Sequence, residues 1–190
     1  RKFFASIDQT ALLEILRKYI PDQDVLWLLR EVIESFSSNQ FILEFSRISE
    51  CPKGLPLGNL TSQLLVNIYM NEFDQVVKHT FKAKYYIRYV DDFVVLSHDK
   101  HEIEKTLRYI VVFLRDTLKL ELHPDKVFIK TFASGIDFLG WVHFPDHRVL
   151  RTATKKRMFR RLKERKGQEG EEATMESYLG LLKHGNTRKL

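Results

Sequence analysis

Apolar side chains recur every three or four positions in four stretches of the chain, which is the spacing of one face of an amphipathic helix. These stretches lie at roughly residues 9–20, 23–36, 61–76 and 103–118. Asp8 is placed to cap the first stretch, and Thr61 or Ser62 to cap the third, because their side-chain oxygens accept hydrogen bonds from free helical amides. The pattern predicts four helices.

Runs of β-branched and aromatic residues predict strands between these helices. Residues 84–90 and 93–97 form two such runs on either side of Asp91 and Asp92, which indicates a hairpin with the acidic pair at its turn. Further strands are expected at 41–45, 127–129 and 138–144, and a breaker-rich loop at 52–60. This order predicts an α+β fold, an antiparallel sheet with helices on one face.

The C-terminal part of the chain is strongly basic. Residues 151–190 hold 12 Lys and Arg against 5 Asp and Glu, whereas residues 1–150 are nearly neutral. We expect Thr154 to cap a basic helix, a flexible acidic link at 167–172, and a last short helix starting at Thr174. The cations of the basic helix suit a nucleic-acid backbone, although a solvated charge run is the alternative. The candidate side chains are Lys155, Arg157, Arg160 and Arg161.

The composition is typical of a folded domain without disulfides or membrane-spanning segments. The chain has 190 residues, 44% apolar and 12% aromatic, which is enough for the core of a folded domain. Its one cysteine, Cys51, cannot form an internal disulfide, as is usual in a reducing compartment, and we interpret it as structural. No apolar run approaches the roughly 20 residues of a membrane span, and no secretory signal precedes the first helix. We therefore expect a cytoplasmic protein without a membrane partner.

Asp91 and Asp92 are the most informative pair in the sequence. Two adjacent like charges repel each other, and a hard divalent cation such as Mg²⁺ neutralises them while keeping coordination positions open for phosphate. The pair therefore indicates a metal site for phosphoryl transfer. The alternative is that both carboxylates only solvate a turn, where Asp is common.

Five segments resemble motifs of the reverse transcriptases, in that family's order. The sequence Tyr-Val-Asp-Asp at 89–92 resembles the catalytic motif, and residues 54–63 resemble the glycine-rich segment over nucleotide and template. Residues 120–126 resemble the lysine-bearing motif, and 135–140 the hairpin that grips the primer. Residues 1–8 resemble the tail of the first catalytic motif, so we expect the natural N-terminus to lie further upstream.

The resemblance implies an RNA-directed DNA polymerase encoded by a bacterium or phage. Residues 1–150 would form an N-terminally truncated core of palm and fingers, and 151–190 the basic start of an α-helical thumb. The implied partners are an RNA template, a DNA or RNA primer and deoxynucleotides. A small basic accessory protein is a further implied partner.

The family's chemistry uses two Mg²⁺ ions, for which Mn²⁺ can substitute, and the resemblance makes Asp91 and Asp92 both catalytic residues and metal ligands. The family's third carboxylate lies two residues before the position of Arg1, outside this chain, while Asp8 is interpreted as a helix cap. We therefore expect a fragment that starts at Arg1 to be inactive in primer extension with Mg²⁺.

Other family positions imply nucleotide and template contacts. Phe4 falls at the steric gate, where an aromatic ring excludes a ribose 2′-hydroxyl. The alternative is that Phe3 and Phe4 are core aromatics, on opposite faces if this segment is a strand. Gly58 would let the backbone approach a base pair closely, and Ser62 and Gln63 would hydrogen-bond to template or backbone.

Two positions depart from the usual family pattern. Most relatives carry Gln before the glycine and Pro after the serine, where this chain has Leu57 and Gln63. This segment resembles the polymerases of diversity-generating retroelements, which misincorporate opposite template adenines, so Leu57 predicts relaxed base selection. A group II intron or retron reverse transcriptase is an alternative, as is a non-catalytic RNA-binding relative.

The last two motifs each allow two interpretations. Lys126 matches the lysine that lies near the pyrophosphate as proton donor or charge clamp, and a solvated lysine in a turn is the alternative. Phe138, Leu139 and Gly140 resemble the primer grip, and either Leu139 or the following Trp141 is expected to pack into the sheet.

Overall fold

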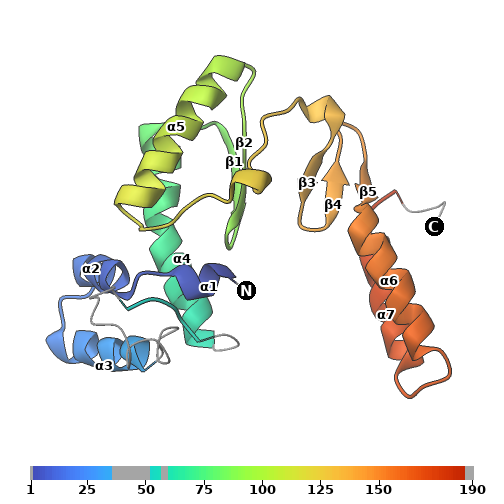
Figure 1. Cartoon of the computed structure of the whole chain (residues 1–190), viewed down its shortest axis with the longest axis horizontal. Helices are drawn as coiled ribbons and strands as arrows, with labels where there is room; N and C mark the ends of the chain where they lie inside the picture. Colours follow the sequence, from blue (N-terminus) through green and yellow to red (C-terminus); the bar gives the residue numbers. More distant parts are fainter. Residues whose placement is uncertain (1, 36–51, 57–59, 187–190) are drawn as a thin grey trace. The chain divides into compact units, whose positions relative to one another are not determined.

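The computed structural model describes residues 2–35, 52–56 and 60–186, which form two compact units, Arg1–Val127 and Phe128–Leu190 (Figure 1). Within the described residues there are seven α-helices and two small antiparallel sheets. The α+β class is confirmed, but the strands form two sheets rather than one. The strand expected at 41–45 lies outside the described residues.

The described residues of the first unit form five α-helices. They are α1 (Lys2–Ser6), α2 (Gln9–Tyr19), α3 (Gln23–Glu34), α4 (Leu60–Gln75), which continues into a π-helical turn (Val76–Thr80), and α5 (Lys100–Asp116). Asp8 caps α2 as predicted, since its Oδ1 accepts a hydrogen bond from the amide of Ala11 at 2.9 Å. Helix α4 already includes Leu60, so the prediction that Thr61 or Ser62 caps it is wrong.

Phe3 and Phe4 lie in α1 and therefore do not alternate as strand residues would. Both are half-buried against the core, with ring centroids 6.0 Å apart in an edge-to-face arrangement. The helix brings both rings toward the same core because consecutive helical residues are only about 100° apart around the axis.

The core of the first unit is built around α4. Its buried residues include Leu65, Val66, Tyr69, Met70 and Phe73. Side chains of α2 and α5 join the same apolar cluster, among them Leu12, Leu16, Ile110 and Leu114. The hairpin of β1 (Tyr85–Tyr89) and β2 (Asp92–Leu96) lies beside α4 and α5 (Figure 1). As predicted, the helices cover one face of this pair of strands.

The second unit is a three-stranded meander followed by a helical hairpin. Its elements are β3 (Ile136–Phe138), β4 (Trp141–His143), β5 (Arg148–Leu150), α6 (Thr152–Arg165) and α7 (Glu171–Leu182). Trp141, Leu150 and Met158 form its small core, against which α7 packs Tyr178 and Leu181.

Several predicted boundaries in this region are wrong. Residues 127–129 form no strand, and the run 138–144 is divided by a turn before β4. Helix α6 begins at Thr152 after Arg151, so Thr154 lies inside it, and α7 begins at Glu171 instead of Thr174. None of the helices described is both long enough and apolar enough to cross a bilayer.

Candidate functional site

The acidic pair lies at a two-residue hairpin turn, as predicted. Tyr89 and Asp92 are the last paired residues of β1 and β2, so Val90 and Asp91 form the loop between them. Val90 has a φ of 55°, whereas Asp91 is not among the residues with positive φ. A positive φ at the first loop position alone is typical of a type II′ turn, where glycine is the usual residue. A β-branched residue in this region is strained.

The register of the hairpin decides which side chains share a face. Directly opposed residues project to the same side of an antiparallel pair. Asp92 therefore shares a face with Tyr89, and this face continues through the pair Ile87 and Val94. Tyr89 and Ile87 are 61% and 55% exposed, so the face that carries the Asp92 carboxylate is open to solvent.

The opposite face of the hairpin packs on α4. Phe93 and Tyr86 both project to this side, and their rings contact Phe73 with centroid distances of 4.9 and 6.0 Å. Phe73 is fully buried and also stacks on Phe113 of α5 at 6.3 Å. These aromatic contacts attach the acidic hairpin to α4 and α5.

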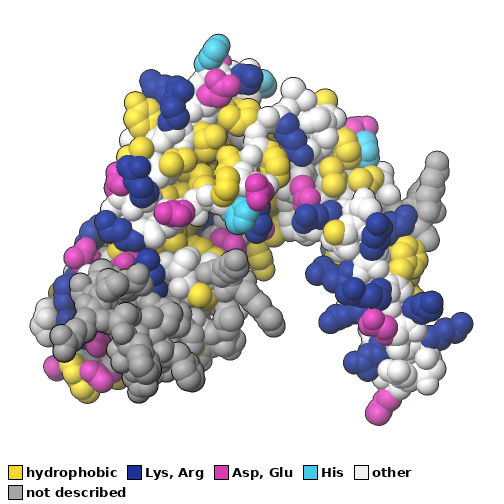
Figure 2. Space-filling model, in the orientation of Figure 1, with side chains coloured by type: hydrophobic (Ala, Val, Ile, Leu, Met, Phe, Trp, Pro, Cys, Tyr) yellow, Lys and Arg dark blue, Asp and Glu magenta, His cyan; other side chains and the backbone are white. Residues whose placement is uncertain are grey.

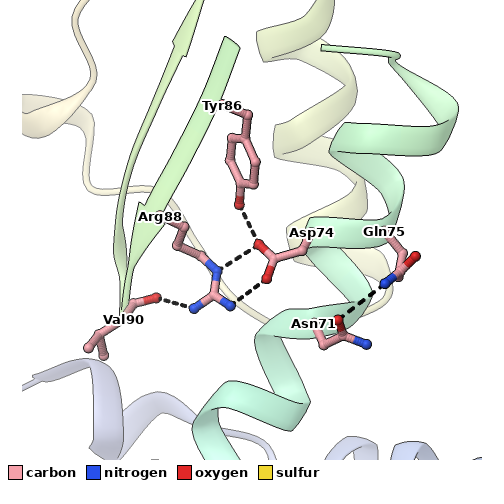
Figure 3. Close-up of polar contacts among 6 residues, drawn as sticks. All are labelled: Asn71, Asp74, Gln75, Tyr86, Arg88 and Val90. Atoms are coloured by element: carbon pink, nitrogen blue, oxygen red, sulfur yellow. Dashed lines mark hydrogen bonds and ion pairs between the residues drawn. The ribbon is translucent and has the colours of Figure 1, made fainter. Parts of the chain in front are cut away.

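A polar network lies beside this aromatic cluster and ends at the turn (Figure 3). Arg88 donates through Nε and Nη2 to the two carboxylate oxygens of Asp74 at 2.7 and 2.5 Å, and through Nη1 to the carbonyl oxygen of Val90 at 2.9 Å. The Tyr86 hydroxyl donates to Asp74 Oδ1 at 2.6 Å. The Arg88 and Asp74 side chains are only 10% and 22% exposed. The network thus joins α4, β1 and the loop residue before Asp91.

The hydrogen bonds of this network shift the pKa values of Asp74 and Arg88 in the directions that keep both side chains charged. Burial acts to raise the pKa of Asp74, but the hydrogen bonds from Arg88 and Tyr86 outweigh burial and hold it below its usual value. The pKa of Arg88 is raised, chiefly by its hydrogen bonds to Asp74. Burial, followed by the hydrogen bond to Asp74, raises the pKa of Tyr86. The phenol therefore stays a donor and the carboxylate an acceptor at neutral pH.

Asp91 and Asp92 are both exposed, and their carboxylates suit a hard cation such as Mg²⁺, which prefers oxygen ligands. Among the described residues there is no group of three His, Cys, Asp or Glu side chains that could hold a metal ion. Within that part of the chain, the turn places two exposed carboxylates next to each other in the sequence. Asp8 does not join them, because its carboxylate caps α2 and is 5% exposed.

The start of the glycine-rich segment is held against the N-terminal helices. Leu55 donates its amide to the carbonyl oxygen of Phe4 at 2.9 Å, and Gly54 donates to Ile7 at 2.8 Å. Phe4 and the residues leading to position 57 are therefore direct neighbours, although about fifty residues separate them in sequence. Leu57 and Gly58 themselves lie outside the described residues. Phe4 and the start of the glycine-rich segment, which the family resemblance places at the nucleotide site, thus meet in the fold.

Gln9 is the residue that sequence reasoning missed here. Its side chain is buried, and Nε2 donates to the carbonyl oxygens of Ile33 at 3.0 Å and Gly54 at 2.9 Å. One amide thereby ties α2 to the end of α3 and to the glycine-rich segment. The available signal was its position three residues before Leu12, on the apolar face of the first helix.

The other predicted nucleotide-site residues differ in accessibility. Ser62 is 1% exposed, and its hydroxyl has no hydrogen-bond partner in the described part of the chain. Gln63, the next residue of α4, is exposed, as is Lys126 at the end of a short 3₁₀ helix (Pro124–Lys126). Gln63 and Lys126 are therefore accessible to solvent, whereas Ser62 faces the interior.

The segment that resembles a primer grip is a second tight hairpin, in the second unit. Leu139 and Gly140 form its loop with φ values of 52° and 83°, the two positive values that a type I′ turn requires. Leu139 is 47% exposed, whereas Trp141 is 6% exposed and packs into the core. The carbonyl oxygen of Gly140 accepts a hydrogen bond from the Arg151 amide at 3.0 Å, which fixes the loop to the start of α6.

Lysine and arginine side chains gather along the helical hairpin of the second unit (Figure 2). A hollow of about 500 Å³ opens on it, lined by Arg157, Arg161, Ala173, Thr174, Ser177 and Tyr178. Arg160 forms an ion pair with Glu164 at 3.8 Å, but no ion pair involves Arg157 or Arg161 within the described residues. Lys155 is half-buried on the same helix. Two guanidinium groups without an ion pair in the described part of the chain lie beside the hydroxyls of Thr174, Ser177 and Tyr178, a combination suited to bind a phosphate.

Comparison with known proteins identifies the family to which the chain is similar. The family model described as reverse transcriptase (RNA-dependent DNA polymerase) matches residues 1–143. The chain is 25% identical over 185 residues to Protein YkfC of Escherichia coli (strain K12), covering 80% of this chain and 46% of that protein. It is 21% identical over 217 residues to the Putative COX1/OXI3 intron 2 protein of Saccharomyces cerevisiae, covering 85% and 24%. The chain spans less than half the length of each relative.

Proposed function

The chain belongs to the reverse transcriptase family, and on this basis we propose that the protein containing it copies RNA into DNA by two-metal nucleotidyl transfer. The observation that carries this proposal is the Tyr-Val-Asp-Asp turn, with its carboxylates on an exposed hairpin end that is firmly attached to α4. Phosphoryl transfer requires little covalent chemistry from the protein, so catalysis depends on positioning and on charge.

Asp91 and Asp92 would hold the divalent ions through their carboxylate oxygens. Such ions, when bound, stabilise both the attacking and the leaving oxygens of an in-line displacement. The chain's own residues position the substrates around the turn. The exposed face with Tyr89 and Ile87 offers an apolar surface for stacked bases or sugars, and Phe4 lies where the glycine-rich segment begins.

A third carboxylate is needed to complete this ligand set, and the resemblance places it two residues before Arg1. We propose that the full protein carries an aspartate there and that a fragment starting at Arg1 is inactive with Mg²⁺. Replacing that aspartate by asparagine in the full protein would then abolish extension. A different residue at that position would favour a non-catalytic, RNA-binding relative instead.

Primer extension on a defined RNA template tests the function in the full-length protein. Asp91→Asn and Asp92→Asn are each expected to reduce extension by at least about a hundredfold, since each removes a charged metal ligand. Asp24→Asn is the matched control, because Asp24 is an exposed aspartate in the first turn of α3, distant in sequence from the turn. Full extension by Asp92→Asn would refute the proposal.

Two types of reverse transcriptase are candidates for this protein. The name of the yeast relative, an intron 2 protein, favours an intron-type reverse transcriptase. Leu57 favours the adenine-mutagenising type, because an apolar side chain cannot hydrogen-bond to the incoming nucleotide as Gln would. Leu57→Gln is expected to lower misincorporation opposite template adenines. If the error spectrum stays the same, the intron-type assignment stands.

We also propose that the hairpin of α6 and α7 binds the nucleic-acid backbone through the hollow beside Arg157 and Arg161. Losing two phosphate contacts weakens binding and reduces its salt dependence. The double variant Arg157→Gln, Arg161→Gln should therefore bind an RNA–DNA duplex more weakly and with a flatter salt profile. The control is Arg160→Gln, because Arg160 is already paired with Glu164. Equal losses in both variants would contradict a specific role for the hollow.

A further inference from the structure

The acidic turn has a backbone conformation that its own sequence disfavours. Val90 has a φ of 55° at the first loop position, where a β-branched side chain is crowded by the backbone. Such conformations persist where surrounding contacts over-determine them, and they are found preferentially at functional sites. A contact from outside the loop is therefore expected to hold the peptide after Val90.

Arg88 supplies that contact. Its Nη1 donates to the Val90 carbonyl oxygen at 2.9 Å, and this carbonyl belongs to the peptide that joins Val90 to Asp91. The orientation of this peptide determines the backbone direction at Asp91, and hence the direction in which the Asp91 side chain projects. The guanidinium is a planar group, so its other nitrogens must point away from the turn when Nη1 points toward it.

Those other nitrogens bind Asp74 near the end of α4. Nε and Nη2 meet the two carboxylate oxygens at 2.7 and 2.5 Å, which is the bidentate arrangement that fixes a guanidinium in one plane. The Tyr86 hydroxyl donates to Asp74 Oδ1, the same oxygen that Arg88 Nε meets, at 2.6 Å and so adds a third hydrogen bond to the carboxylate (Figure 3). With Arg88 at 10% exposure, solvent competes little for these bonds.

We propose that Arg88 is a positioning residue for the acidic turn, oriented by Asp74 and Tyr86, and that it sets the placement of the Asp91 and Asp92 carboxylates for metal binding. Through Arg88, Asp74 of α4 thus restrains the conformation of a loop that lies outside α4. The catalytic consequence rests on the proposed polymerase function, whereas the effect on the turn does not.

Lysine cannot replace arginine in this role. A lysine has one ammonium group at the end of a flexible stem and can pair with Asp74 as a point charge, but it cannot present a rigid fork to Asp74 and a third donor to Val90 at once. Arg88→Lys therefore separates charge from geometry, because it keeps the cation and loses the planar arrangement.

The chain contains a matched control on the same helix. Glu72 lies two residues before Asp74 and also binds one cation and one phenol, with Lys18 Nζ at 3.0 Å and Tyr19 Oη at 2.7 Å. Its partners are in α2, and among the hydrogen bonds of the described residues neither Lys18 nor Tyr19 bonds to Val90 or Asp91. Glu72→Gln thus removes a similar set of bonds from α4 without changing the anchor of Val90.

The experiment compares Arg88→Lys, Asp74→Asn and Glu72→Gln in the full-length protein by three measurements. These are the melting temperature, hydrogen–deuterium exchange of the peptide covering residues 89–93, and the Mg²⁺ concentration for half-maximal primer extension. We expect Arg88→Lys and Asp74→Asn to speed exchange of the turn peptide and to raise the Mg²⁺ midpoint by about tenfold or more, as for other residues that orient metal ligands. Glu72→Gln should leave both unchanged.

The proposal is overturned if Arg88→Lys and Asp74→Asn lower the melting temperature as Glu72→Gln does but leave turn exchange and the Mg²⁺ midpoint at the wild-type values. That result would make the network a stabilising ion pair alone. If the wild-type protein extends no primer, the proposed polymerase function fails, and exchange of the turn peptide alone then decides whether Arg88 holds the turn.

Discussion

Replacing Phe73 by alanine should detach the acidic hairpin from α4. The Phe73 ring is fully buried and lies within 4.9 to 6.3 Å of the ring centroids of Phe93, Tyr86 and Phe113. The first two belong to the hairpin and the third to α5, so one side chain joins three elements of the unit. Its removal leaves a cavity at the point where they meet.

The structure sets the size of the effect. Truncating a buried Phe to Ala typically costs about 3–5 kcal/mol, and we expect the upper half of this range because three aromatic neighbours lose a partner. A domain is typically stable by only about 5–15 kcal/mol, so the loss is a large share of the total. Phe73→Leu keeps most of the volume and should cost about 1–2 kcal/mol.

Urea denaturation followed by circular dichroism at the helical band measures this loss. With a typical slope of about 2 kcal/mol per molar urea, Phe73→Ala should lower the midpoint by about 2 M. Leu64→Ala is the control, because Leu64 lies in the same helix but is 61% exposed, and its change should stay within about 0.5 kcal/mol. If Phe73→Ala shifts the midpoint no further than Leu64→Ala does, the hairpin is not held by this cluster.

Three further predictions concern other parts of the chain. If the full-length protein is the proposed polymerase, Phe4→Ala should raise its ribonucleotide incorporation in a gel-based misincorporation assay, and unchanged sugar selectivity would count against Phe4 as the steric gate. The ion pair of Asp74 and Arg88 should stabilise the protein at neutral pH and lose this effect in acid. The pKa of Asp74 is lowered in the folded state, so this stabilisation is complete above the usual carboxyl pKa of about 4. It is lost as the pH falls through the lower pKa of the folded protein. The difference in urea midpoint between wild type and Asp74→Asn should therefore disappear in acid. Gly185→Ala should destabilise the second unit, since a Cβ at Gly185 would lie 2.0 Å from the Trp141 ring, and an unchanged melting curve would contradict this packing.

Local patterns in the sequence were sufficient to predict most of the elements. Helical spacing predicted α2, α3, α4 and α5, and the runs on either side of the acidic pair predicted the hairpin. These features depend on neighbouring residues alone, which is why the Asp8 cap was also correct. The wrong boundaries, such as the caps at Ser62 and Thr154, are positions where several polar residues near a helix start could serve equally well.

The family was likewise predictable from the sequence, because its motifs consist of particular side chains at fixed spacing, among them the acidic turn. The anchor of that turn was not. Asp74 and Arg88 are fourteen positions apart, and nothing local in the sequence distinguishes their pairing from that of any other charges. The same holds for the contact between Phe4 and Leu55, and for the burial of Gln9 and Ser62.

The order of the residues is thus enough to identify the candidates for the chemistry, whereas the packing of helices and strands fixes how these residues are held. Hydrophobic periodicity and turn preferences depend on residues that are close in the sequence, so they can be recognised without the structure. The orientation of the Val90 peptide depends on a guanidinium fixed by a carboxylate on another element, and such a pair exists only after α4 and β1 have packed together.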